Sequence, residues 1–529
     1  MIMAPKVLIS DKLSQRAVDI FKDNGIDVDF KPGLSKEELL EIIDQYDGLA
    51  IRSATKVTEK VLENAKNLKV VGRAGIGVDN VDVPKATASG VIVMNTPFGN
   101  SITTAEHAIA MMFALARQIP QANESTQQGK WEKSKFMGVE LTSKTLGIIG
   151  CGNIGGIAAS RAIGLKMKVI AFDPFLTPER ALEIGVEKVE LDELLKRSDF
   201  ISLHTPLTEK TKNIIGADAF PKMKDGIRII NCARGGLIDE AALKEALDSG
   251  KVAGAALDVF EEEPAKENIL FGHPNVICTP HLGAATSEAQ ENVALQVAEQ
   301  MSDYLNTGAI TNALNFPSIS AEEAPKLKPF VALAEKLGLF AGQLTETGLK
   351  AIRIEYAGPV GEMNTKALTS AAVTGVLQPL LSNVNMISST SVAKDRGITI
   401  EEVKREHPSA YETYIRLTVV TERQERSVAG TVFSDGKPRI IQVKGISMDA
   451  GFSENMLYVT NLDKPGFIGS LGSVLSKHGI NIATFALGRT EEAGDAIALI
   501  GVDGEPADAV VEEVRGLENV VQVKTLSFI

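Results

Sequence analysis

Short apolar, β-branched runs alternate with helical patterns from Lys6 to about Pro280, and this alternation constrains the fold more than any other feature of the chain. One series runs KVLIS, IDVDF, DGLAIRS, LKVVGRAG and VIVMNTP; a second runs TLGIIG, KVIAFDP, FISLHTP, IRIINCARG, AGAALDVF and VICTPHLG. Apolar strands separated by helices pair in parallel and are covered on both faces. The pattern therefore predicts two α/β lobes, each a doubly wound parallel sheet with ligands at the carboxyl ends of its strands.

Two long helical patterns are expected to connect these lobes. The first runs from Ser101 to about Gln118 with an apolar face for burial, and a polar segment, 121–143, follows it. The second runs from Ser287 to about Tyr304 and is expected to return the chain to the first lobe. The predicted first lobe therefore comprises residues 4–100 and 284–316, and the predicted second lobe comprises residues 101–283.

The chain beyond Pro317 predicts two further domains. Residues 317–452 mix helical stretches such as KPFVALAEKLGLFAGQL with strand-like stretches such as AIRIEYAG, which indicates a separate α+β domain. Residues 455–529 follow the order strand, helix, strand, strand, helix, strand. That order is typical of a ferredoxin-like βαββαβ sandwich.

Charge and cysteine content exclude several classes of protein. The net charge of −13 repels nucleic-acid phosphates and anionic membranes, and no long run of Lys or Arg offsets it. The three cysteines, Cys151, Cys232 and Cys278, are too widely spaced for a disulfide framework or a zinc site. The apolar runs are far shorter than the roughly 20 residues of a membrane span, and the first residues lack a signal-peptide pattern. We therefore expect a cytoplasmic protein without a nucleic-acid, membrane or metal partner.

The strand TLGII leads into Gly150-x-Gly152-x-x-Gly155, which opens a helix. Glycines at these positions permit a tight turn and let the backbone approach a pyrophosphate at the helix N-terminus. Asp173 ends the next strand, where an acidic side chain accepts hydrogen bonds from the ribose hydroxyls and repels a 2′-phosphate. The same spacing occurs in ordinary glycine-rich turns, but its strand–turn–helix setting favours a Rossmann-like lobe that binds NAD rather than NADP.

Three polar residues follow strands of the second series and are candidates for the chemistry. Arg234 follows IRIINCA, Glu263 lies in the loop EEEP, and His281 follows VICTP. A histidine can accept the proton of a secondary alcohol, a carboxylate can orient that histidine, and the planar fork of arginine can bind a substrate carboxylate. Taken singly, the three also fit a loop cation, a solvated acid and a residue at a helix N-terminus.

Five segments together carry a resemblance to a known family: GIIGCGNIGG, ISLHTPLTEKTKNIIG, MKDGIRIINCARGGLIDEAAL, AGAALDVFEEEP and TPHLGA. They resemble the D-isomer-specific 2-hydroxyacid dehydrogenases. The resemblance implies that Arg234 binds the substrate carboxylate, that His281 is the acid and base, and that Glu263 orients His281. Besides the glycines and Asp173, it implies NAD contacts from Ile76, Asn153, Ile154, Thr205, Cys232, Ala233, Arg234, Asp258, His281, Gly283 and Ala284.

The whole chain resembles the long members of this family, which act on 3-phospho-D-glycerate and carry an intervening domain and an ACT regulatory domain. RSATKVT, VGRAGIGVDNVD and NTPFGNS are similar to their substrate-binding segments, which implies that Arg52, Arg73 and Asn100 contact the phosphorylated acid. NLDKPGFIG and HGINIA are similar to the ACT signature, which implies L-serine as an effector. The matching positions are Asn461, Asp463 and Asn481, which also fit ordinary turn and helix-cap chemistry.

We therefore expect NAD-dependent oxidation of 3-phospho-D-glycerate to 3-phosphohydroxypyruvate, the first step of phosphorylated L-serine biosynthesis, by a self-associating enzyme. One alternative is a dehydrogenase or reductase of another 2-hydroxy or 2-keto acid, such as 2-oxoglutarate. An alternative from another class is an NAD-sensing, corepressor-like binding protein, although such proteins do not carry the intervening and ACT domains.

Overall fold

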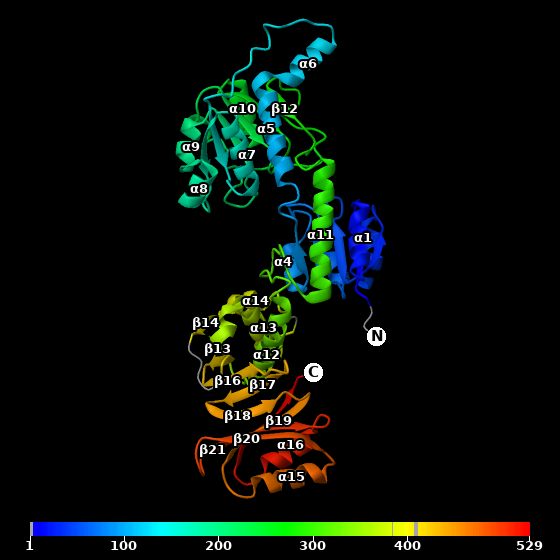
Figure 1. Cartoon of the computed structure of the whole chain (residues 1–529), viewed down its shortest axis with the longest axis vertical. Coiled ribbons are helices and arrows are strands. Elements are labelled where there is room, and N and C mark those ends of the chain that lie inside the picture. Colours follow the sequence, from blue (N-terminus) through cyan, green and yellow to red (C-terminus); the bar gives the residue numbers. More distant parts are fainter. Residues whose placement is uncertain (1–3, 383, 407–410, 529) are drawn as a thin grey trace.

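The computed structural model describes residues 4–382, 384–406 and 411–528. Its four sheets belong to four units that follow one another along an elongated molecule (Figure 1). The second lobe lies at one end, the first lobe beside it, and the two C-terminal domains extend to the other end. Within the described residues, no helix is long and apolar enough to cross a membrane.

The first lobe is a five-stranded parallel sheet in the order β2-β1-β3-β4-β5. Val7, Leu8 and Ile9 are fully buried, as expected for a parallel strand that is covered on both faces. Its elements are β1 (Lys6–Ile9), α1 (Gln15–Asp23), β2 (Asp27–Phe30), α2 (Lys36–Ile42), a 3-10 turn (Ile43–Gln45), β3 (Gly48–Ile51), α3 (Glu59–Asn64), β4 (Val70–Arg73), α4 (Val83–Ala88) and β5 (Ile92–Met94).

Helix α11 (Ser287–Thr307) packs on this first sheet although it follows the second lobe in the sequence. The Thr286 side chain starts the helix by accepting a hydrogen bond from the amide of Ala289 (3.1 Å). Val297 and Met301 on this helix are fully buried in the core that includes Val7 and Val70 of the sheet. Apolar burial therefore brings residues that are more than two hundred positions apart into one packed unit.

The second lobe is a seven-stranded parallel sheet in the order β12-β11-β10-β9-β6-β7-β8, and with the first sheet it confirms the predicted pair of Rossmann-like lobes. Its strands are β6 (Thr145–Ile149), β7 (Lys168–Phe172), β8 (Glu187–Lys188), β9 (Phe200–Leu203), β10 (Ile227–Asn231), β11 (Val252–Leu257) and β12 (Val276–Cys278). Its helices are α5 (Ser101–Arg117), α6 (Ile119–Gln127), α7 (Asn153–Gly164), α8 (Pro178–Ile184), α9 (Leu191–Arg197), a 3-10 turn (Phe220–Lys222) and α10 (Glu240–Asp248).

Helix α6 was not predicted from the sequence. Gln118 adopts a left-handed conformation (φ 51°) that ends α5, and Pro120 then lies in the first turn of α6, where its missing N–H leaves no bond unmade. Only Ser125 of α6 is buried. The helix therefore lacks the apolar periodicity by which helices are recognised in a sequence.

The third unit confirms the predicted α+β domain. Its six-stranded sheet has the order β14-β13-β15-β16-β17-β18, in which only the β13–β14 pair is parallel. Its elements are α12 (Ala324–Gln343), β13 (Leu349–Ala357), a 3-10 turn (Gly358–Glu362), α13 (Thr365–Leu377), α14 (Ser389–Asp395), β14 (Thr399–Arg405), β15 (Tyr414–Thr421), β16 (Glu425–Val432), β17 (Pro438–Val443) and β18 (Ile446–Gly451).

The fourth unit confirms the βαββαβ prediction, with the antiparallel sheet order β20-β21-β19-β22. Leu457 and Val459 of β19 pack in the core with this unit's own helices, whereas Met456 and Tyr458 belong to a core that includes Phe340 of α12. The sheet is therefore buried on both faces and joined to the third unit. Its elements are β19 (Asn455–Leu462), α15 (Phe467–Lys477), β20 (Ile482–Arg489), β21 (Asp495–Val502), α16 (Asp508–Arg515) and β22 (Val520–Ser527).

Candidate active site

The candidate residues of the second lobe lie at or just beyond the carboxyl ends of parallel strands. The order is Gly150 after β6, Asp173 after β7, Thr205 after β9, Cys232, Ala233 and Arg234 after β10, Asp258 and Glu263 after β11, and His281 after β12. Because these strands run parallel, their ends meet at one edge of the sheet. The fold thus gathers residues from 150 to 281 into one region.

The glycine loop between β6 and α7 leaves room for a ligand. Gly150 has a φ of 89°, and a Cβ there would lie 2.7 Å from the carbonyl oxygen of His204. A Cβ on Gly155 would collide with the Gly150 carbonyl, whereas a Cβ on Gly152 would meet no atom within 4 Å. The first and third glycines therefore close the turn, and the second faces open space at the start of α7, beside Asn153 and Ile154. This arrangement fits a pyrophosphate at a helix N-terminus.

Asp173 is held at the edge of the glycine loop. Its Oδ2 accepts a hydrogen bond from the amide of Cys151 and its Oδ1 accepts one from the amide of Phe175, both at 2.8 Å. A carboxylate oxygen can accept more than one hydrogen bond, so both oxygens retain capacity for ribose hydroxyls. The position fits the adenosine side of NAD.

His281 and Glu263 form a hydrogen-bonded pair. Nδ1 of His281 lies 2.7 Å from Oε2 of Glu263, and Oε1 of Glu263 accepts a hydrogen bond from the amide of Phe260 (3.1 Å). The hydrogen bond to Glu263 raises the pKa of His281, with burial acting in the opposite direction. Burial by itself would raise the pKa of Glu263, but the bonds from His281 and Phe260 outweigh it and lower that pKa. Glu263 is therefore an ionised carboxylate that fixes the imidazole through Nδ1, so that Nε2 is the ring nitrogen not engaged by this pair.

Asp258 anchors the loop that carries His281. The side chain is fully buried and accepts hydrogen bonds from the Thr279 hydroxyl (2.6 Å) and the amides of Leu282 (2.7 Å) and Gly283 (2.8 Å). The backbone carbonyl of Asp258 accepts a further bond from the amide of His281 (2.9 Å), whose φ is 54°. This network holds the histidine in a left-handed conformation that residues other than glycine rarely adopt.

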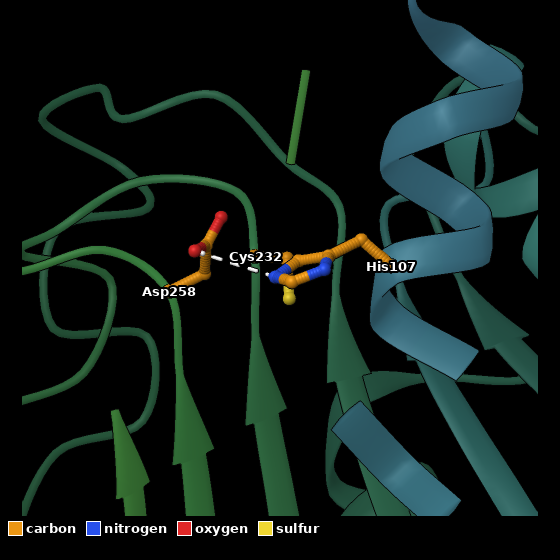
Figure 2. A group of neighbouring side chains, drawn as sticks. All are labelled: His107, Cys232 and Asp258. Carbon is orange, nitrogen blue, oxygen red and sulfur yellow. Dashed lines mark ion pairs between the residues drawn. The ribbon is translucent and has the colours of Figure 1, made fainter. Parts of the chain in front are cut away.

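His107 and Cys232 lie beside Asp258 (Figure 2). Atoms of the three side chains that could bind a metal lie within 4.8 Å of one another. Nε2 of His107 lies 3.3 Å from Oδ1 of Asp258. The oxygens of Asp258 already accept hydrogen bonds from the chain, and burial raises the pKa of the Cys232 thiol, which therefore keeps its proton. This donor set fits a structural support for the His281 loop better than a metal centre, because a thiol binds metal as a thiolate.

A cavity of about 670 Å³ lies between the first and second lobes, and both the predicted substrate residues and the His281–Glu263 pair line it. Arg52, Arg73 and Asn100 line it from the first lobe, and Glu263 and His281 line it from the second. Nε of Arg73 and Oδ1 of Asn100 are buried and have no hydrogen-bond partner among the described residues. Unsatisfied buried polar atoms are costly, so a ligand that bonds to these two atoms would relieve that cost.

Positive charge converges on this cavity. Burial, together with the nearby guanidinium groups of Arg234 and Arg52, lowers the pKa of Arg73 to about 10, although Asp79 and Asp11 partly offset this effect. An anion in the cavity would relieve this repulsion. The site therefore suits a substrate that bears more than one negative charge.

Arg234 does not line the cavity itself. Its Nε donates to Oδ2 of Asp79 in the first lobe (3.2 Å), and its Nη1 donates to the carbonyl of Ala233 (2.7 Å). Asp79 was not predicted from the sequence, although it lies in the loop after β4 together with Ile76. Its position after a parallel strand, in a segment already assigned to substrate binding, was the available signal.

Several residues of the cavity wall were also not predicted. Ser53 follows Arg52, and Phe260, Pro264, Phe271 and Cys278 form an apolar wall. Of the predicted cofactor residues, Ala284 lines the same cavity, Gly283 is fixed by Asp258, and the carbonyl of Ile76 accepts a hydrogen bond from Asn95 (2.6 Å).

The three residues that were predicted to bind L-serine do not lie together within one chain. Asn461 pairs with Ala496 at one end of the sheet, whereas Asn481 precedes the Ile482–Val502 pair at the other end. Asn461 is buried and its Oδ1 lacks a partner among the described residues. Asp463 forms an ion pair with Arg489 (2.6 Å), and Nδ2 of Asn481 donates to Asp503 (2.9 Å).

Three family models match the chain. They are the NAD binding domain of D-isomer specific 2-hydroxyacid dehydrogenases over residues 109–283, the D-3-phosphoglycerate dehydrogenase intervening domain over residues 326–444, and the ACT domain over residues 455–519. The second lobe is thus an NAD-binding domain, as the glycine loop and Asp173 predicted.

Among the similar proteins are two D-3-phosphoglycerate dehydrogenases. The one from Archaeoglobus fulgidus is 43% identical over 98% of both chains, and the one from Bacillus subtilis is 42% identical over 98% of this chain and 99% of its own. A solved glyoxylate reductase from Paecilomyes thermophila is 32% identical with a TM-score of 0.55, over 59% of this chain and 98% of its own. Because the two dehydrogenases match almost end to end, the chain belongs to the D-3-phosphoglycerate dehydrogenase family.

Proposed function

We propose that this chain oxidises 3-phospho-D-glycerate to 3-phosphohydroxypyruvate with NAD, the first step of phosphorylated L-serine biosynthesis. The observation that carries the proposal is a single cavity in which Arg52, Arg73 and Asn100 face the His281–Glu263 pair. Relatives with end-to-end similarity are named for this substrate.

His281 accepts the hydroxyl proton of the substrate at Nε2, because Nδ1 is committed to Glu263. The Glu263 carboxylate then stabilises the imidazolium that forms, as its effect on the His281 pKa indicates. NAD, when bound in the second lobe, would supply the acceptor for the hydride that leaves the substrate carbon. In the direction of reduction, the same histidine returns the proton, so a raised pKa serves both directions.

Arg234 binds the carboxylate next to the reacting carbon, and the arginines of the first lobe bind the phosphate. A guanidinium matches the geometry of both groups and makes paired, charge-assisted hydrogen bonds. Arg73 and Asn100 offer buried polar atoms without partners among the described residues, so ligand contacts there replace no existing protein bond.

We assign NAD binding to residues on both sides of the cleft. They are Ile76, Gly150, Gly152, Asn153, Ile154, Gly155, Asp173, Thr205, Cys232, Ala233, Arg234, Asp258, His281, Gly283 and Ala284. The open space beside Gly152 and the fixed carboxylate of Asp173 support this assignment.

The test is NADH formation from a panel of 2-hydroxy acids. We expect 3-phospho-D-glycerate to have the highest kcat/KM, well above D-glycerate, which lacks the phosphate, and above D-2-hydroxyglutarate, which tests the rival 2-oxoglutarate chemistry. Equal use of D-glycerate and its 3-phosphate would contradict a site built for phosphate.

L-serine is the effector that we propose for the ACT domain. Because Asn461 and Asn481 lie at opposite ends of one sheet, serine would have to bind between the ACT domains of two chains. A titration of activity with L-serine, with D-serine as control, tests this. An activity that stays constant at millimolar L-serine would exclude feedback control.

We also propose that the enzyme self-associates, is cytoplasmic, and has domain boundaries at 100/101, 283/284 and 316/317, with the ACT domain starting at 455. Trp131 and Met137 support self-association, because their side chains are 86% and 75% exposed on the segment after α6. Phe136 lies with them in the lining of one surface hollow, and apolar side chains that gather in a contiguous exposed patch mark contact surfaces. Light scattering of the purified chain tests this, and a monomer at micromolar concentration would refute it.

A further inference from the structure

Arg234 is held from the opposite side of the cleft. Its own strand, β10, belongs to the second lobe, but Nε donates to Asp79 of the first lobe (3.2 Å). Nη1 donates one hydrogen to the Ala233 carbonyl (2.7 Å). A guanidinium has five N–H donors, so three remain, two of them on Nη2.

The surface that receives the guanidinium is shaped for it. A Cβ on Gly77 would collide with Nη2 of Arg234, so the absence of a side chain there lets the guanidinium lie against the loop. The next residue after Asp79 fixes the loop, since Nδ2 of Asn80 donates to the carbonyls of Arg52 (2.7 Å) and Thr55 (2.6 Å). The Asp79 carboxylate therefore lies on a loop that these hydrogen bonds hold in place.

Exposure argues for a small contribution from this pair, because exposed ion pairs contribute little to stability. The Asp79 side chain is 76% exposed, but that of Arg234 is only 29% exposed. The pair also joins two lobes that must be oriented for the reaction. Its consequence is therefore expected in geometry and catalysis rather than in folding.

We propose that Asp79 is a positioning residue that holds the Nε edge of Arg234 against the first lobe, so that the remaining N–H groups of the guanidinium are kept in place to bind the substrate carboxylate. The inference rests on the proposed role of Arg234 in substrate binding. Without Asp79, Arg234 keeps its charge but loses its orientation. Removal of this carboxylate also removes a negative charge that offsets the repulsion of Arg73 by Arg234 and Arg52.

The test is a double-mutant cycle of Asp79→Ala and Arg234→Lys, with kcat and KM measured separately for the acid and for NAD. We expect Asp79→Ala to lower kcat/KM for the acid by about 10- to 100-fold, as misplaced binding groups do. The KM for NAD should change by less than about twofold, because Asp79 is not among the residues that we assign to NAD binding. Asp79→Asn, which keeps an oxygen acceptor, should recover most of the loss.

In the Arg234→Lys background, Asp79→Ala should lower kcat/KM for the acid by less than about threefold, because the effects of mutating two residues in contact are not additive. Asp225→Asn is the matched control, since it breaks an exposed ion pair with Lys251 at a distance from the cleft. An unchanged kcat/KM in Asp79→Ala, or an equal loss in both backgrounds, would overturn the proposal.

The choice of substrate separates this inference from the proposed function. If the wild type does not oxidise 3-phospho-D-glycerate but oxidises another 2-hydroxy acid, the proposed function fails and the cycle is measured with that acid. If the wild type oxidises no acid in the panel, both proposals fail.

Discussion

Replacing Arg73 by Gln should separate phosphorylated from unphosphorylated substrates. The change removes a positive charge whose Nε is buried without a partner among the described residues, in the wall of the cavity that holds His281. A hydrogen bond to a charged group contributes about 1.5–3 kcal/mol. Since 1.36 kcal/mol is a factor of ten, the loss in kcat/KM for 3-phospho-D-glycerate should be roughly 10- to 150-fold. D-glycerate offers Arg73 no phosphate, so its kcat/KM should fall by less than about threefold.

The assay is the initial rate of NADH formation at low substrate, with both acids and both enzymes. Thermal melting of Arg73→Gln confirms that the variant is folded. Arg73→Lys should lie between the wild type and Gln for the phosphorylated acid, because it keeps the charge and loses the fork. An equal loss for both acids would refute the assignment of Arg73 to the phosphate.

Three further predictions follow from the site. Glu263→Gln removes the group that raises the pKa of His281, so the histidine should stay deprotonated at lower pH. The acid limb of the kcat/KM profile for oxidation should therefore move to lower pH, and the maximum should fall by roughly 10²-fold. An unmoved acid limb would contradict the pairing. Asp173→Ala should raise the ratio of kcat/KM for NADP to that for NAD by about tenfold or more, and an undiminished preference for NAD would exclude Asp173 as the selector. Asp258→Asn places an N–H donor opposite a backbone amide, such as that of Gly283, that now donates to the carboxylate. The free energy of unfolding should fall by about 2–4 kcal/mol, and Tm in differential scanning calorimetry should fall by roughly 5–15 °C. A change under about 2 °C would show that the buried network contributes little to stability.

The positions of Gly150, Asp173 and His281 could be predicted because each follows its own strand. In a parallel sheet the end of every strand reaches the same edge, so strand recognition alone places these residues together. The burial of Val7 to Ile9 shows why the strands themselves were visible as uninterrupted apolar runs.

The Asp79–Arg234 pair could not be predicted in the same way. The two residues are 155 positions apart and belong to different lobes, so their contact depends on how the lobes are oriented rather than on any strand end. Asn461 lies near the carboxyl end of β19 and Asn481 lies before the amino end of β20. Because both strands run antiparallel to β21, the two residues lie at opposite ends of the sheet. Helix α6 escaped prediction because it buries almost none of its surface.

The most direct test of the account compares the wild type with His281→Gln, using 3-phospho-D-glycerate and NAD. The wild type should form NADH, and the variant should be slower by about 10²-fold or more while it still binds NAD, measured by fluorescence titration. Equal turnover by the two enzymes would contradict the role of His281. A wild type that binds NAD but forms no NADH from any 2-hydroxy acid would identify a sensor instead of an enzyme.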